Sequence, residues 1–385
     1  MEIQKLKDIC LTEITDGTHQ TPTYSESGYI FLSSKNVTTQ KIDWDNVMFI
    51  PEKLHKELYK RVAPQIDDIL LAKNGTTGVS AIVDRDIVFD IYVSLALIRP
   101  NTEIVMPKYL LYALNNPVVK RYFDSSLKGI GVPNLHLKNI RETPIKIYDL
   151  ETQKAIVEKL DKVCKLMSLR KQQIAKLDEL VKARFVEMFG ESEYPCNSLI
   201  SLIIEGAGLS YGIVQPGDDG TGDMGVLRPV DFADGKIKTD SIKYIDRSLG
   251  DGFKKTELNG NELLITVRGT TGITALTDSR FKGMNVTRGI AVIRYDEKKI
   301  DPIYLNEYLK MEESQQYIKE HTRGATLQQI NLSDLRDLKV MVPPLLLQQA
   351  FSAFVERVDQ QKQTVQQSLE KLELMKKALM QEYFG

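Results

Sequence analysis

The sequence predicts an α+β protein in which one globular domain occurs twice and each copy is followed by a long helix. Three observations support this prediction. Short segments recur at a fixed offset, two stretches without proline or glycine carry apolar residues at heptad spacing, and the rest mixes strand-like and helix-like runs. We expect domains at residues 1–150 and 191–345, and helices at residues 151–190 and 346–385.

The repeat can be read directly from the sequence. GTTG at 75–78 returns at 269–272, an offset of 194 residues. At an offset of 195, ALIR at 96–99 matches AVIR at 291–294, and VEMFG at 186–190 matches QEYFG at 381–385. A period of this length is too long for a solenoid, so it indicates a duplicated domain.

Within the first domain, short apolar runs separated by Gly, Pro, Asn and Asp indicate strands. The expected strands are YIFLSS at 29–34, DILLA at 68–72, VSAIV at 79–83, YVSLALIR at 92–99 and PIKIY at 144–148. Helices are expected for PKYLLYALNN at 107–116 and PVVKRYF at 117–123, because proline is favoured in the first turn of a helix. GTTG lies between two apolar runs and predicts a hairpin turn.

The two long helices carry sustained heptads, which favour a coiled coil. The apolar positions seven residues apart are Leu160, Met167, Ile174, Val181 and Met188, and then Phe351, Val358, Val365, Leu372 and Leu379. Each helix would be roughly 55–60 Å long. Because the two ends of a domain usually lie close together, the second helix would run back along the first. We expect an antiparallel two-helix coiled coil with one domain at each end and a pseudo-twofold axis; helices packed only on their own domains are the alternative.

Composition limits the possible classes of protein. The net charge is −1, and the first 150 residues hold 18 Lys and Arg against 18 Asp and Glu, so DNA binding by bulk positive charge is not indicated. Three scattered cysteines offer neither a disulfide framework nor metal-ligand spacing. Without an apolar leader or a run long enough to cross a bilayer, we expect a cytoplasmic protein that makes no membrane contact.

Motifs of the relevant enzymes are missing from the sequence. No GxxxxGK[ST] phosphate-binding loop occurs. An adenine methyltransferase would need Asn or Asp before Pro-Pro and an aromatic residue after it, whereas Pro343-Pro344 follows Val342 and precedes Leu345. We therefore expect no catalytic residue, no metal site and no cofactor in this chain.

Several segments resemble the specificity (S) subunits of type I restriction-modification systems, the HsdS family. DGTHQTPTYSESGYIFLSSKNV at 16–37, DDILLAKNGTTGVSAIV at 67–83, YGIVQPG at 211–217 and VLRPVDFADG at 226–235 look like target recognition domains of that family. The segments leading into both long helices look like its helical regions, although the Pro-Pro of the second copy has no counterpart at Ile147-Tyr148-Asp149.

The resemblance implies a reader of double-stranded DNA without chemistry of its own. Each domain would read one half of a bipartite asymmetric site in the major groove, and the helices would set the unread gap. Two methyltransferase (M) subunits and the restriction and translocase (R) subunits would be partners, which would also hold S-adenosylmethionine, ATP and Mg²⁺. A partner that fuses methyltransferase and nuclease is one alternative, and a two-headed coiled-coil scaffold that binds no DNA is another.

Base readout needs side chains that offer donors and acceptors to base edges. We compare the two copies to sort the candidates. Features present in both copies would form the scaffold or position phosphates, whereas features that differ would read the two different half-sites. Candidates in the first domain are Thr18, His19, Gln20, Tyr24, Ser34, Lys35, Asn36, Lys73, Asn74, Thr76 and Thr77. Candidates in the second domain are Ser210, Tyr211, Gln215, Arg228, Arg268, Thr270 and Thr271. The alternatives are threonines that only shape the turn, cations that are merely solvated, and a His19 or Tyr24 that caps or packs a loop.

Overall fold

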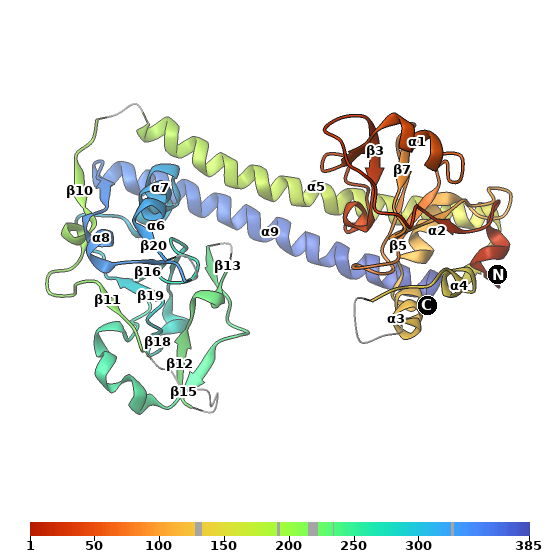
Figure 1. Cartoon of the computed structure of the whole chain (residues 1–385). Helices are drawn as coiled ribbons and strands as arrows, with labels where there is room; N and C mark the ends of the chain where they lie inside the picture. The colour runs from red at the N-terminus through yellow and green to blue at the C-terminus, as the bar shows by residue number, and fades with distance from the viewer. Residues whose placement is uncertain (128–132, 191–192, 215–221, 234, 325–326) are drawn as a thin grey trace. The chain divides into compact units, whose positions relative to one another are not determined.

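A computed structural model describes residues 1–127, 133–190, 193–214, 222–233, 235–324 and 327–385 (Figure 1). The chain forms two compact units. The first contains residues 1–172 and 366–385, and the second contains residues 173–365. Both long helices, α5 (Leu150–Phe189) and α9 (Leu345–Phe384), therefore contribute residues to both units.

The first unit is built around two sheets. An antiparallel four-stranded sheet has the order β2-β8-β5-β6, with strands Thr15–Asp16, Leu95–Ile98, Ile69–Ala72 and Ser80–Ile82. A three-stranded sheet has the order β4-β3-β7, with strands Met48–Ile50, Tyr29–Leu32 and Phe89–Ile91, and β3 runs parallel to β7. A third pair, β1 (Glu2–Lys5) with β9 (Pro144–Ile147), places the start and the end of the domain side by side.

The four-stranded sheet is buried on both faces, which explains why β5 is apolar throughout. Ile69 and Leu71 pack on a cluster with the helices, whereas Leu70 and Ala72 pack towards the three-stranded sheet. The helices of the first unit are α1 (Glu52–Leu58), α2 (Pro107–Leu114), α3 (Pro117–Ser126) and α4 (Leu137–Arg141), with 3-10 turns η1 (Leu6–Ile9) and η2 (Ser34–Val37). Both predicted proline-led helices are confirmed.

The second unit repeats this plan, and the predicted duplication is confirmed. Its four-stranded sheet is β11-β19-β16-β17, its three-stranded sheet is β15-β12-β18, and β10 pairs with β22. These strands are Ser210–Tyr211, Ile290–Ile293, Leu263–Thr266, Thr274–Leu276, Lys243–Ile245, Met224–Leu227, Asn285–Val286, Cys196–Ser198 and Lys339–Met341. The helices before α9 are α6 (Pro302–Lys310), α7 (Glu312–His321) and α8 (Leu332–Asp337).

Smaller elements complete the second unit. Two short pairs occur, β13 with β14 and β20 with β21, at Phe232–Ala233, Lys236–Ile237, Thr322–Arg323 and Gln329–Ile330. The 3-10 turns are η3 (Leu199–Leu202), η4 (Pro229–Asp231), η5 (Arg247–Thr256) and η6 (Ser279–Phe281). The position of η4 in the second unit corresponds to that of η2 in the first.

The long helices pair inside each unit, and they do so in antiparallel fashion. In the first unit Ile156 and Leu160, near the start of α5, share a core cluster with Met380 and Phe384, near the end of α9. In the second unit the Phe185 ring, near the end of α5, lies 5.5 Å from the Phe351 ring, near the start of α9. Helices packed only on their own domains are therefore excluded.

A buried glutamine near the N-terminus of each long helix forms hydrogen bonds to the backbone of the preceding domain. The Gln153 side chain accepts from the Met106 amide at 2.8 Å and donates to the Ile104 carbonyl at 2.9 Å. Gln348 accepts from the Asp301 amide and donates to the Pro343 carbonyl, both at 2.8 Å. The two copies thus enter their helices alike, despite the missing Pro-Pro of the first.

The GTTG segments form the predicted hairpin turns, between β5 and β6 and between β16 and β17. Their glycines have positive φ angles of 74° and 82° in the first copy and 82° and 87° in the second. The predicted strand at 92–99 is wrong at its start, because β8 begins at Leu95. Residues 92–94 form a turn instead, since the chain must cross there from the three-stranded to the four-stranded sheet.

Candidate nucleic-acid interface

The turn at residues 92–94 and its counterpart at 287–289, which we name the crossover turns, contact three candidate segments in each unit. These segments are the first loop (residues 14–24 or 209–214), the 3-10 turn η2 or η4, and the start of the GTTG hairpin turn. In the first unit the Val93 amide donates to the Thr18 carbonyl at 2.9 Å. The Ser34 amide donates to the Ser94 hydroxyl at 2.9 Å, and the Lys73 amide donates to the Ser94 carbonyl at 2.8 Å. Three segments that are far apart in sequence therefore meet at one turn.

The second unit has the same convergence. The Arg288 amide donates to the Ile213 carbonyl at 2.9 Å, and the Val267 amide donates to the Gly289 carbonyl at 2.8 Å. Pro229, at the start of η4, packs closely on Gly289. A Cβ atom added to Gly289 would lie 2.7 Å from the Cγ atom of Pro229. The crossover turn is therefore the centre of the candidate surface in both units.

One glycine allows this convergence in each copy. A Cβ atom on Gly17 would lie 1.9 Å from the Ile91 carbonyl oxygen, and one on Gly212 would lie 1.9 Å from the Val286 carbonyl oxygen. Neither glycine has a positive φ angle, so the requirement comes from the close approach of two backbones and not from strain.

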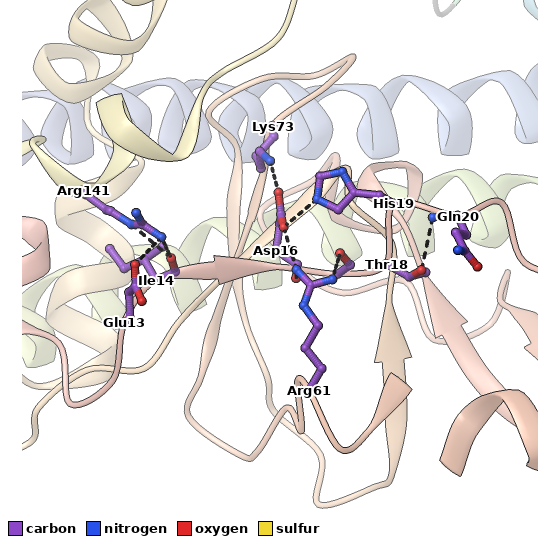
Figure 2. A network of polar contacts seen from close by, with 10 residues as sticks. Glu13, Ile14, Asp16, Thr18, His19, Gln20, Arg61, Lys73 and Arg141 are labelled. Atoms are coloured by element: carbon purple, nitrogen blue, oxygen red, sulfur yellow. Dashed lines mark hydrogen bonds and ion pairs between the residues drawn. The ribbon is translucent and has the colours of Figure 1, made fainter. Parts of the chain in front are cut away.

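One arginine also ties the base of the first candidate loop in each copy. Arg141 Nη2 donates to the Ile14 carbonyl at 2.7 Å (Figure 2), and Arg336 Nη2 donates to the Leu209 carbonyl at 3.2 Å. Both arginines lie in the short helix that precedes the last strand of the domain, α4 or α8. They stabilise the frame, and the matched positions in both copies support that role.

Beneath the first loop lies a buried ion pair that only the first unit has. The Lys73 ammonium donates to the Asp16 carboxylate, and both side chains are at most 8% exposed (Figure 2). His19 Nε2 and Arg61 Nη2 each lie 3.2 Å from the other carboxylate oxygen. Burial by itself raises the pKa of the Asp16 carboxyl, but the hydrogen bonds and charges of Lys73 and His19 outweigh it, so this pKa lies below its ordinary value.

The second unit places apolar chemistry at the same positions. Tyr211 follows the register of Asp16, and Val267 that of Lys73. Val267 is fully buried, and the half-buried Tyr211 packs against the same hydrophobic cluster. The two copies thus share a backbone frame but differ in what lies under the first candidate loop.

The 3-10 turns η2 and η4 contain candidates of two kinds, some bound within the fold and some exposed. The Asn36 side chain is buried, accepting from the Ser33 amide and donating to the Asn46 carbonyl, both at 2.9 Å. At the matching place in η4 the Asp231 carboxylate is fully buried and pairs with Arg228 at 3.0 Å. Lys35, like its counterpart Val230, is exposed, and Ser34 is half-buried.

The hairpin turns present one threonine each. Thr76 and Thr270 are exposed, whereas Thr77 is buried and the Thr271 hydroxyl lies 3.1 Å from that of Thr322. Asn74 and Arg268 are half-buried and form isolated β-bridges, to Asn134 and Gln329 respectively. Within the described part of the chain, the buried Nε of Arg268 has no hydrogen-bond partner.

The remaining candidates that the structure describes lie in the first loop. His19, Gln20 and Tyr24 are exposed, and the Gln20 amide donates to the Thr18 hydroxyl at 3.2 Å (Figure 2). Thr18 and Ser210 are half-buried. Gln215 lies outside the residues that the structure describes.

Sequence reasoning missed the crossover turns. Residues 92–94 read YVS and residues 287–289 read TRG, directly ahead of strands that match at the same offset of 195. The tripeptide YVS contains two strand-favouring residues and directly precedes a strand, so the sequence pattern predicts it as part of that strand. The available signal was the mismatch itself, since YVS and TRG differ at every position although the segments that follow them match.

Nothing in the described residues suggests a metal centre or a membrane span. No group of three or more His, Cys, Asp and Glu side chains is placed to hold a metal ion in the described ranges. Among the same residues, no helix is both long and apolar enough to cross a bilayer.

Known proteins are similar to this chain over most of its length. A family model described as the type I restriction modification DNA specificity domain matches residues 1–179 and 221–374. The chain is 25% identical to a Methanocaldococcus jannaschii protein provisionally named as the MjaX type I restriction enzyme specificity subunit, covering 98% of this chain and 91% of that protein. It is 22% identical to the EcoBI type I restriction enzyme specificity subunit of Escherichia coli, over 63% and 58% of the two chains.

Two solved structures share the fold. A type I restriction-modification S subunit from M. genitalium has a TM-score of 0.59 at 13% identity, with 100% of this chain and 96% of that chain covered. A chain from a structure of complex assembly and conformational transition in the type I R-M system has a TM-score of 0.58 at 18% identity, with coverage of 100% and 97%.

Proposed function

Since the chain belongs to the type I restriction modification DNA specificity family, whose model covers most of its residues, we propose that each of its two units reads one half of a bipartite DNA site. In this role the chain is the DNA sequence-specificity subunit of a type I restriction-modification enzyme. It supplies no catalytic group, and S-adenosylmethionine, ATP and Mg²⁺ bind to its partners. Those partners are two methyltransferase subunits, joined by restriction and translocase subunits for cleavage.

One observation supports the proposal most directly: the two units keep the same frame and change the exposed side chains. Gly17 and Gly212 make the same backbone contact, and Arg141 and Arg336 make the same tie. The exposed side chains on that frame differ between the copies. They differ in the crossover turns, at the tips of η2 and η4, and beside the GTTG turns. A reader of an asymmetric site needs this combination, because phosphates are alike in both half-sites and bases are not.

The proposed readout relies on placement and not on bulk charge. The chain carries 51 Lys and Arg against 52 Asp and Glu, so non-specific attraction to phosphates is weak. Binding would then depend on side chains at the crossover turns and on cations that the methyltransferase partners add. We expect the isolated chain to bind duplex DNA weakly and the complex with methyltransferase to bind it tightly.

The experiment that tests this proposal exchanges one domain for the other. The β1–β9 register pairs Glu2 with Ile147, and the β10–β22 register pairs Cys196 with Met341, so both domains begin and end at adjacent strands. Residues 196–341 can therefore replace residues 2–147. Co-purified with methyltransferase, the exchanged chain should select a symmetric site made of two second half-sites from a random duplex library.

The wild-type chain is the control and should select an asymmetric site. A wild-type complex that selects no sequence at all contradicts DNA reading and leaves the two-headed scaffold as the better account. An exchanged chain that still selects the wild-type site contradicts the assignment of one half-site to each unit.

A further inference from the structure

The second domain, at residues 191–345, contains eight arginines, at positions 228, 247, 268, 280, 288, 294, 323 and 336. Six of them are held by the fold. Their guanidinium groups bind carboxylates or backbone carbonyls, in the pairs Arg228–Asp231, Arg247–Asp223, Arg280–Asp278, Arg294–Glu262, Arg323–Asp334 and Arg336 with the Leu209 carbonyl. An arginine that is not held in this way is an exception that needs another explanation.

Arg288 is such an exception, and it lies in the crossover turn. Its side chain is exposed and makes no hydrogen bond, ion pair or ring contact with any residue in the described ranges. Its backbone, in contrast, is fixed, because its amide donates to the Ile213 carbonyl at 2.9 Å and the Thr287 amide donates to the Leu227 carbonyl at 2.9 Å. A free guanidinium on a rigid backbone loses only side-chain entropy when it binds a ligand.

The position of Arg288 is central in the candidate surface. Its turn contacts the first loop through Ile213, η4 through Pro229 and the start of the hairpin turn through Val267. Arg268 follows Val267 directly and also keeps a guanidinium nitrogen without a partner in the described part of the chain. The matching residue in the first unit is Val93, which cannot donate a side-chain hydrogen bond.

Guanidinium chemistry selects one base edge. Arginine offers several N–H donors in a planar fork and no acceptor. In the major groove only guanine presents two adjacent acceptors, O6 and N7, to which arginine binds in bidentate fashion. We propose that Arg288 determines specificity for a guanine in the half-site read by the second unit, an inference that rests on the proposed function above.

A contact to phosphate would predict a different pattern between the copies. Both half-sites have the same sugar-phosphate backbone, so a phosphate contact at the centre of the surface would need a cation in both units. The first unit has Val93 there. An arginine in one copy and a valine in the other is the pattern of a base contact that differs between half-sites.

The test is sequence selection from a random duplex library, using the full chain in complex with methyltransferase. Arg288→Val installs the residue of the first unit. Its complex should lose preference for guanine at one position of one half-site, by about 5- to 150-fold, with all other positions unchanged. Arg288→Lys keeps the charge without the fork and should lose most of the same preference. Arg280→Val is the matched control, because Arg280 is exposed and paired with Asp278, and it should leave selection unchanged.

Each contrary result has a defined meaning. A wild-type half-site without guanine, or unchanged selection by both Arg288 variants, overturns the inference. Uniformly weaker binding on all sequences, with a shallower salt dependence, overturns it in favour of a phosphate contact. If both Arg288 variants fail to fold while Arg280→Val folds, Arg288 is structural and the inference is wrong. A wild-type complex that selects no sequence refutes the proposed function itself, which is a separate outcome.

Discussion

At the scale of single residues, the pair Asp16–Lys73 shows how one frame position can hold opposite chemistries. In the first unit it is a buried ion pair, and in the second unit the same places hold Tyr211 and Val267. A buried ion pair and an apolar pair can be similarly stable, whereas half of an ion pair is costly. The pair therefore contributes more to the position of His19 and Arg61 than to net stability.

We predict that Lys73→Met destabilises the first unit by about 3–5 kcal/mol at pH 7, because Asp16 is left as a buried charge with reduced compensation. The pH dependence follows from the lowered pKa of Asp16. In the wild type this pair stabilises the fold above the ordinary carboxyl pKa of 3.8 and loses that contribution as the pH falls through the lowered value. The difference between wild type and variant should therefore shrink as the pH falls below 3.8, towards the lowered pKa of Asp16.

The measurement uses the single tryptophan, Trp44, which is buried in the first unit and edge-on to Phe89. Its fluorescence during urea unfolding reports on that unit within the full chain. Lys108→Met is the control, because Lys108 pairs with Asp161 while 51% exposed, and an exposed pair contributes about 0–1 kcal/mol. Equal effects of the two variants, or a difference that grows as the pH falls, would contradict this account.

At the scale of elements, the crossover turn depends on a backbone contact that only glycine permits. Gly212 lies against Val286, and the Ile213–Thr287 bridge follows directly. We predict that Gly212→Ala forces these strands apart and costs on the order of 3 kcal/mol. The exposed Gly252 is the control, because a Cβ atom there meets nothing within 4 Å and its φ angle is not positive, so Gly252→Ala should be tolerated.

Hydrogen exchange of the β18–β19 segment, Asn285–Val286 to Ile290–Ile293, would detect this opening. Exchange in Gly212→Ala should rise there and stay unchanged in the first unit. Unchanged protection across this segment would show that the close approach can relax, which would remove the argument for a required glycine.

At the scale of the whole molecule, α5 and α9 each contribute residues to both units. If the helices set the distance between half-sites, one added heptad in each helix adds about 10 Å. We predict that the unread gap then lengthens by about three base pairs, at ~3.4 Å per base pair, while the bases read stay the same. Methylome sequencing of cells that carry the altered chain measures both quantities, and a gap of unchanged length would exclude the helices as the ruler.

The sequence alone determined the duplication, the heptad helices, the hairpin turns and the family. These features depend on local periodicity and on matches between distant segments, which one sequence displays. It could not show that Asn36 and Arg228 are engaged by Ser33 and Asp231, or that Lys73 lies buried against Asp16. These hydrogen bonds and ion pairs depend on the tertiary fold, which determines the side chains that lie next to one another.

The crossover turns were decided only by the tertiary structure. Residues 92–94 look like part of a strand because tyrosine and valine favour strands, and the need to cross between two sheets overrides that preference. Their central place exists because Thr18, Ser34 and Lys73, distant in sequence, form hydrogen bonds to one turn. Local patterns specify elements, whereas a recognition surface is specified by which loops the packing of two sheets brings to one edge.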